Sequence, residues 1–354
     1  MTTLEEAGPG GVAEAPCEGN RPRRGAGFTP AAGLGGARWT HPITGDSGER
    51  SGIHSRAASG GAGGCDGSTP QLNAAAISDR EFALFQGLIH RQAGIYLAPV
   101  KKPLLVGRLM RRLRDLGLSS FGAYYRVVTE PGGEAEQVRM LDLICTNETH
   151  FFREPRQFEF LERQVFPAWA EQAAAGRRTR KIRVWSAACS TGEEPYTLAM
   201  VLLRRFPDWE IEILGSDLST RVLDAARAGL YRIEKAAEIP DTYRKAFMLR
   251  GTGSQEGRMK AGPEIRSLVR FERLNLSHQS WPLGGVFDLL FCRNVLIYFD
   301  PASKARVVDR LLERLHPQGY LFLGHAEGLR GLHARIQGVG PTVYVHREGH
   351  APRG

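Results

Sequence analysis

The segment ACSTGEEPYTLAM, residues 188–200, decides the fold of this 354-residue chain. It follows the apolar run IRVWSA and leads into a helical pattern, which is where nucleotide-binding α/β folds place a glycine-rich loop. This turn, however, has one glycine, no lysine and two adjacent acids, Glu193 and Glu194. Because carboxylates repel phosphate and attract cations, the turn predicts a phosphate-free ligand that carries positive charge.

Around this turn, from about Lys181 onward, short apolar runs alternate with helical patterns. Such alternation predicts a doubly wound, Rossmann-like α/β sheet, in which the ligand lies beyond the carboxyl ends of the strands. Residues 232–267 interrupt the alternation with a glycine-containing, charged sequence. We interpret this segment as a small inserted β-subdomain that consists of a pair of hairpins. The expected strands are Ile182–Ala187, Ile211–Gly215, Leu268–Phe271, Phe287–Cys292, Tyr320–Leu323 and Thr342–His346.

Asp217 ends the second expected strand, in GSDLST. An acid at this place in a dinucleotide-type fold accepts hydrogen bonds from ribose hydroxyls, although it could equally cap the next helix. A nucleoside ligand that is cationic and lacks phosphate is S-adenosylmethionine, which would explain the two glutamates. Acids also stabilise a helix N-terminus through its dipole, so the sequence leaves open which of Glu193 and Glu194 meets the ligand.

A further motif precedes the sheet, TNETHFFREPRQFEFLER at residues 146–163. The hydrogen-bonding side chains of Asn147 and Thr149, with the cation of Arg153, are typical of the edge of a lid, where arginine is available to a carboxylate. Thr149 could instead cap a helix. The two phenylalanines between them are expected in the core.

The chain before the sheet divides into a tail and a helical region. Residues 1–75 are rich in glycine, alanine, serine and proline, which predicts disorder. Residues 76–145 have helical periodicity, and a helix over about 103–116 carries basic residues opposite a leucine stripe. This basic face is either solvated or docks an acidic partner, and the candidate docking residues are Arg108, Arg111 and Arg112.

The composition agrees with a folded cytoplasmic protein. The formal net charge is +9, and residues 1–75 hold six arginines against seven acids, so the excess of positive charge belongs to the remainder. No apolar run reaches the length of a membrane helix, and the N-terminus has no signal-peptide pattern. The five cysteines are scattered, which predicts reduced thiols, and no metal-ligand cluster is evident.

Taken together, the motifs resemble those of the chemotaxis receptor glutamate methyltransferases, the CheR type. The resemblance covers about 78–347, and five motifs occur in the family's order: TNETHFFRE, VWSAACSTGEEPYTLAM, GSDLSTRVLDAARAGLY, FDLLFCRNVLIYFD and LFLGHAEGL. It implies an N-terminal helical domain (76–145), a linker with a ligand-contact helix (146–180), and a methyltransferase domain (181–349) with the inserted β-subdomain.

The resemblance also implies roles for individual residues. Arg153 and Tyr298 resemble the pair that acts near the reacting groups, and Glu194 is the better candidate than Glu193 for the methionine amino group. The expected contacts of S-adenosylmethionine are Asn147, Thr149, Arg153, Glu193, Glu194, Asp217 at the ribose, Asn275 and Leu276 at the adenine, and Arg293 and Asn294 after the fourth strand.

The resemblance implies methylation of glutamate side chains on acidic, helical, cytoplasmic regions of methyl-accepting receptors, by a monomer that neither binds nucleic acid nor enters the membrane. S-adenosylhomocysteine would be the product. A carboxylate is already ionised at neutral pH and needs no general base. Two alternatives remain: a nucleic-acid methyltransferase, which the basic charge would suit, and a non-catalytic regulator that binds the cofactor.

Overall fold

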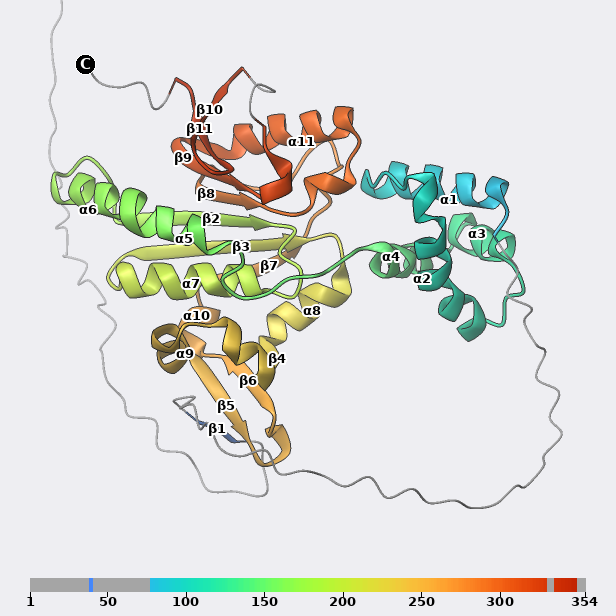
Figure 1. Ribbon diagram of the computed structural model, residues 1–354, viewed down its shortest axis with the longest axis horizontal. Coiled ribbons are helices and arrows are strands. Elements are labelled where there is room, and N and C mark those ends of the chain that lie inside the picture. Colours follow the sequence, from blue (N-terminus) through green and yellow to red (C-terminus); the bar gives the residue numbers. More distant parts are fainter. Residues whose placement is uncertain (1–37, 41–76, 330–333, 349–354) are drawn as a thin grey trace, which may run out of the picture. The chain divides into compact units, whose positions relative to one another are not determined.

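The computed structural model describes residues 38–40, 77–329 and 334–348 (Figure 1). The first part of the described chain is helical, as predicted, and its four helices pack around a common core that includes Phe85, Leu105 and Tyr124. Ser78 and Glu81 form the expected capping box at the start of the first helix. The helices are α1 (Asp79–Ala93), α2 (Lys102–Asp115), α3 (Phe121–Thr129) and α4 (Glu134–Ile144).

The second part is built on a seven-stranded sheet in the order β10-β11-β9-β8-β2-β3-β7. Five neighbouring strands, β9-β8-β2-β3-β7, run parallel, and the last two strands of the chain add an antiparallel edge on the β9 side. The predicted α/β class and the six predicted strands are therefore confirmed, with an added strand, β10. The strands are β2 (Lys181–Ala187), β3 (Glu210–Asp217), β7 (Val269–Arg273), β8 (Phe287–Cys292), β9 (Leu315–Leu323), β10 (Ile336–Gly340) and β11 (Val343–His346).

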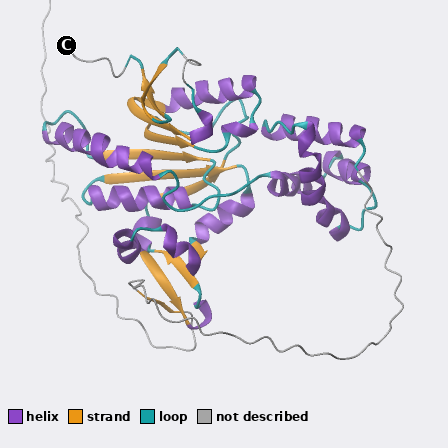
Figure 2. Cartoon of the chain, viewed as in Figure 1, coloured by secondary structure: helices purple, strands orange, loops and turns teal. Residues whose placement is uncertain are grey.

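Helices lie on both faces of this sheet, as Figure 2 shows. Alternate side chains of β2 point to opposite faces of the sheet: those of Ile182 and Val184 belong to one core, and that of Trp185 belongs to the other. The first core holds α5 (Pro155–Phe160), a π-helical turn (Leu161–Val165), α6 (Phe166–Ala174) and α7 (Glu193–Arg205), and the second holds α11 (Pro301–Arg314).

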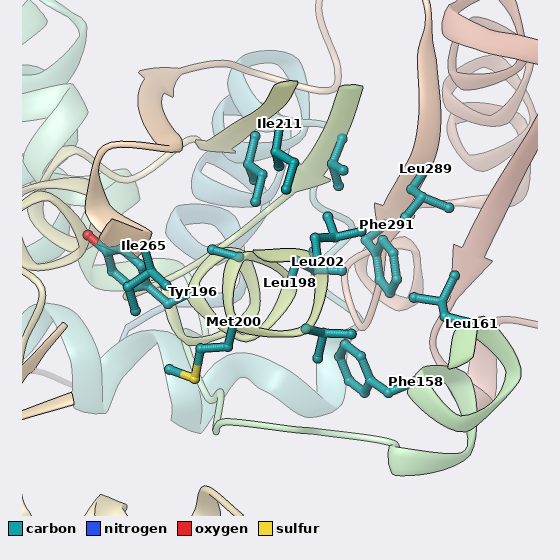
Figure 3. Close-up of a cluster of buried hydrophobic side chains, with 14 of the residues drawn as sticks. Phe158, Leu161, Tyr196, Leu198, Met200, Leu202, Ile211, Ile265, Leu289 and Phe291 are labelled. Atoms are coloured by element: carbon teal, nitrogen blue, oxygen red, sulfur yellow. The ribbon is translucent and has the colours of Figure 1, made fainter. Parts of the chain in front are cut away.

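The first of these cores fixes α7 against the strands (Figure 3). Leu198 and Leu202 of α7 lie in one buried cluster with Phe291 of β8 and with Phe158 and Leu161 of the preceding helical segment. Because α7 begins directly after the turn that follows β2, this packing fixes the position of the turn and of the two glutamates that start the helix.

The interruption at 232–267 forms a small antiparallel sheet, with the order β1-β5-β6-β4. Its strands are separated by short helical elements, and α8 (Thr220–Ala228) leads into it. The elements are β4 (Leu230–Arg232), η3 (Ile233–Glu238), α9 (Asp241–Phe247), β5 (Met248–Thr252), η4 (Gly253–Gln255), β6 (Arg258–Ala261) and α10 (Pro263–Arg266).

The fourth strand of the small sheet, β1 (Arg38–Thr40), comes from the tail. The prediction of disorder over 1–75 is therefore wrong for these three residues, because composition does not register a short segment that pairs with a strand far along the chain. The rest of that prediction lies outside the described residues. None of the helices within the described ranges combines the length and apolar character that crossing a bilayer requires.

Candidate active site

A cavity of about 590 Å³ lies where β2, β3 and β8 end and the strand order reverses. The helical domain contributes to its wall through residues such as Tyr96 and Leu104, so the cavity is closed by two parts of the chain. The sequence-predicted residues that line it are Asn147, Thr149, Arg153, Glu194, Asp217, Asn275, Leu276, Arg293, Asn294, Tyr298 and Arg108.

Glu193 and Glu194, which follow the turn after β2, have different partners. Glu193 is only 1% exposed and does not line the cavity; its carboxylate accepts hydrogen bonds from Lys235 Nζ (2.8 Å) and Thr191 Oγ1 (2.6 Å). Glu194 lines the cavity and accepts a hydrogen bond from Ser186 Oγ at 2.6 Å. Of the two, Glu194 is therefore the carboxylate available to a ligand in the cavity.

Glu194 belongs to a buried charge network. Arg293, whose side chain is 2% exposed, places Nη1 3.2 Å from Glu194 Oε2 and Nη2 3.6 Å from Glu154 Oε2. Burial raises the pKa of Glu194, and the charge of Arg293 and the hydrogen bond from Ser186 oppose that rise. One guanidinium thus lies between two carboxylates in the wall of the cavity.

Asp217 binds the two turns that follow β2 and β3. Its carboxylate accepts the backbone N–H groups of Ser190 (2.9 Å) and Ser219 (3.0 Å), and burial raises its pKa against these hydrogen bonds. The N-cap of α8 is Ser219, whose hydroxyl accepts the N–H of Val222, so the residue that caps the helix directly is not Asp217. Asp217 therefore lines the cavity and, through these two hydrogen bonds, holds both turns in place beside it.

The linker before α5 is held at the site by hydrogen bonds to its backbone carbonyl groups as well as by its side chains. Ser190 Oγ donates to the carbonyl of Asn147 (2.9 Å), and Lys235 Nζ donates to the carbonyl of Thr149 (3.1 Å). Arg153 Nη1 donates to the carbonyl of Glu148 (3.0 Å). The alternative that Thr149 caps a helix is wrong, because the N-cap of α5 is Glu154.

The adjoining phenylalanines divide between core and cavity. Phe151 is 1% exposed and packs edge-on against Tyr231, which confirms the expectation of a core position for it. Phe152 is half-buried, contacts Phe158 and Tyr243, and lines the cavity. The expectation of a core position is therefore only partly met for Phe152.

Two further contacts join the cavity wall to the helical domain. Asn275 Nδ2 donates to the carbonyl of Gln92 (2.6 Å), and the N–H of Tyr96 donates to the carbonyl of Tyr298 (2.8 Å). The N–H of Asn294 donates to Glu327, which is fully buried. The first two contacts join the residues that follow β7 and β8 to α1 and to the segment after it.

Backbone strain concentrates at this site. Among the described non-glycine residues, six have positive φ, and four of these line the cavity: Phe152, Ala188, Ser190 and Asn294. A fifth, Glu154, contacts Arg293. Such conformations cost free energy and persist where the surrounding structure enforces them, often at functional sites.

The three arginines predicted to dock a partner have different surroundings. Arg112 forms a two-pronged ion pair with Glu136 (2.8 and 2.5 Å) that Tyr124 joins, so its charge is neutralised within the helical domain. Arg108 donates to the carbonyl of Ile144 and to Thr146 Oγ1, and lines the cavity. Arg111 is exposed.

Sequence reasoning missed Lys235, Glu154 and Ser186, which support Glu193, Arg293 and Glu194 respectively. Glu154 and Ser186 lie within motifs that we quoted, so proximity in sequence was an available signal. Lys235 lies in the insertion, and only the folded chain brings it to the turn.

The side chains suit a cationic nucleoside. Within the described chain, three buried donor atoms of cavity-lining residues have no hydrogen-bond partner: Asn147 Nδ2, Arg293 Nε and Arg293 Nη1, the last of which is in the ion pair with Glu194. A polar ligand would satisfy such donors. Glu194 offers a carboxylate to a cation, and Asp217 lies at the end of β3, where ribose is bound in such folds. The turn after β2 has no glycine-rich cradle for phosphate.

A doubly wound sheet with this cavity at its switch point defines the class of α/β S-adenosylmethionine-dependent methyltransferases. The chain belongs to the CheR methyltransferase family. The model of its SAM-binding domain matches residues 147–345, and that of its all-alpha domain matches residues 80–145. The cofactor predicted from the turn and from Asp217, S-adenosylmethionine, is thereby confirmed.

Curated relatives agree over most of their length. The chain is 40% identical to chemotaxis protein methyltransferase 2 of Pseudomonas aeruginosa, over 75% of this chain and 92% of that protein. It is 39% identical to the chemotaxis protein methyltransferase of Escherichia coli, over 76% and 92%. The corresponding protein of Borreliella burgdorferi is 31% identical, over 76% and 94%.

Proposed function

We propose that this protein transfers the methyl group of S-adenosylmethionine to glutamate side chains of chemoreceptors, and that the products are γ-glutamyl methyl esters and S-adenosylhomocysteine. Membership of the CheR family carries this proposal, together with a cavity lined by the carboxylate of Glu194 and by unpaired donors, which match the cofactor. The relatives' names supply the pathway, chemotaxis.

In this proposal the cofactor is held by residues from three strand ends and from the linker. Glu194 binds the methionine amino group, Asp217 accepts the ribose hydroxyls, and Asn275 and Leu276 flank the adenine. Asn147 and Arg293 satisfy their unpaired donors on it. Glu193 stabilises the turn by pairing with Lys235, and the cofactor contributes an electrophilic methyl group.

The chain's own task is to orient the acceptor carboxylate and exclude water. The acceptor glutamate is ionised at neutral pH, so it needs no general base. Arg153 and Tyr298, both on the cavity wall, each hold it by a hydrogen bond. Alignment at near-attack distance lowers the activation barrier, and a dry cavity removes water from charges that cancel during the reaction.

The rim of the cavity suits a helical acceptor. The large hydrophobic side chains of Tyr96 and Ile297 are 56% and 51% exposed, and both line the cavity. The exposed Arg111 on α2 adds positive charge that would attract an acidic helix. We propose that the acidic, helical, cytoplasmic region of a receptor lies across this rim and that the protein acts as a monomer.

Methyl transfer to receptor fragments tests the proposal. The protein is incubated with methyl-labelled S-adenosylmethionine and, in parallel, with receptor cytoplasmic fragments, the same fragments with their glutamates changed to glutamine, or RNA. We expect label on the first fragments alone, released by base as methanol, which is diagnostic of a carboxyl ester. Label on RNA would favour a nucleic-acid methyltransferase, and cofactor binding without transfer to any acceptor would favour a regulator.

A further inference from the structure

The outer edge of the small sheet is occupied by three residues from the distant N-terminal part of the chain. Arg38, Trp39 and Thr40 of β1 pair antiparallel with Thr252, Gly251 and Arg250 of β5. The sheet order β1-β5-β6-β4 makes β1 the last strand on that side. Without β1, the backbone of β5 would present an unpaired edge, which is a ready template for any extended chain.

Side chains reinforce this pairing. Thr252 Oγ1 donates to the carbonyl of Arg38 at 3.0 Å. Trp39 is half-buried while Arg38 and Thr40 are exposed, so the indole is the side chain that meets the sheet. Lys260 Nζ of β6 lies 5.5 Å from the centre of the Trp39 ring, within the range of a cation–π interaction.

The sequence limits this strand to a short segment. Gly35 and Gly36 precede it and Pro42 follows it, in GGARWTHP. Glycine weakens a strand and proline cannot donate to a ladder, so the pairing cannot extend far in either direction. Three residue pairs and one aromatic anchor are the contacts by which an extended peptide adds a strand to the edge of a sheet.

We propose that Arg38–Thr40 is an intramolecular peptide ligand of the small sheet, which occupies the β5 edge in place of a strand from another molecule. Because the segment is covalently attached, its effective concentration at the edge is on the order of mM, which a competing peptide must overcome. The tail thereby sets a threshold for any extended peptide with an aromatic side chain that would use this edge. This inference is independent of the acceptor and of the proposed function.

Hydrogen exchange on the full-length protein tests the occupancy. Replacement of Trp39 by alanine removes the ring contact, and a triple R38G/W39G/T40G replacement removes the strand. We expect backbone amides of β5 to exchange about tenfold faster or more in the triple variant, because each lost hydrogen bond contributes roughly 1 kcal/mol, with the W39A variant between it and the parent. Exchange in β2 and β3 should be unchanged, which verifies that the variants fold. Equal exchange of β5 in all three proteins would overturn the proposal.

A labelled peptide with the sequence GARWTHP tests the competition. We expect it to bind the triple variant and to bind the parent protein at least about tenfold more weakly, whereas the same peptide with alanine for tryptophan should bind neither. Equal affinity for parent and variant would show that the edge is not occupied. Protection of β5 that rises with protein concentration would place the strand of a second copy there and would overturn the intramolecular assignment.

Discussion

The carboxyl edge of the large sheet and the outer face of α2 both gather charged side chains, but their surroundings differ. At the sheet edge the side chains of Glu194, Asp217 and Arg293 are largely shielded from water. On α2 the exposed Arg111 lies one position before Arg112, which is bound to Glu136. The comparison teaches that the burial and the partners of a charged side chain, more than its residue type, decide whether it can bind a ligand, stabilise the fold or attract a partner protein.

The largest effect is expected at the sheet edge, from Asp217→Asn. The amide cannot accept both backbone N–H groups and ribose hydroxyls as the carboxylate does, so cofactor affinity should fall at least about 100-fold, roughly 2.7 kcal/mol. Calorimetric titration with S-adenosylhomocysteine measures this. Near-parental affinity in a variant with an unchanged melting temperature would contradict the ribose assignment.

On α2 the neighbouring arginines should respond in opposite ways. Arg112→Ala leaves Glu136 and Tyr124 without their partner and should lower the free energy of unfolding by about 2 kcal/mol. Arg111→Ala should leave stability within about 0.5 kcal/mol and raise the KM for receptor. Urea denaturation and receptor methylation at two salt concentrations separate the two effects. Equal stability loss in both would remove the distinction between them.

The two glutamates of the turn offer a matched pair. Glu194→Gln should weaken cofactor binding about tenfold, because the cationic amino group loses its carboxylate. Glu193→Gln should leave that affinity nearly unchanged and instead lower stability, because Lys235 loses its counter-charge. Fluorescence titration and thermal unfolding of both variants decide the matter, and the reverse result would exchange their roles.

A smaller, pH-dependent effect is expected where α1 meets the start of α11. His90 Nε2 lies 2.8 Å from Asp300 Oδ2, and Asp300 also accepts the N–H groups of Ala302 and Ser303 at the start of α11. The hydrogen bond with His90, followed by those from Ser303, holds the pKa of Asp300 well below its ordinary value.

A depressed carboxyl pKa stabilises the folded state above the unfolded value of about 3.9, and this contribution is lost as the pH falls below it. Asp300→Ala should therefore cost about 1 kcal/mol at neutral pH and progressively less below about pH 4. Unfolding free energies of the parent and the variant across this range measure it. A difference that stays constant with pH would assign the effect to packing alone.

Much of the fold could be predicted because local patterns of apolar residues indicate each helix and strand. The predicted bounds of Phe287–Cys292 agree with the structure to the residue, since a buried parallel strand is a nearly continuous apolar run, which only Asp288 interrupts here. The site residues that directly follow a strand could also be predicted, because the residues after consecutive parallel strands converge at one edge of the sheet. Arg112 and Lys235 could not be placed, because their partners Glu136 and Glu193 are 24 and 42 residues away.

By itself, the sequence determined the α/β class, the helical domain, the cofactor and a candidate turn for binding it, because strand periodicity and the charge of a turn are local properties. Tertiary structure alone decided which glutamate faces the cavity, which arginine is left exposed, and that Arg38–Thr40 completes the small sheet. Those outcomes depend on pairings between distant segments, and a pairing is specified by both partners together, whereas a sequence pattern describes only one of them.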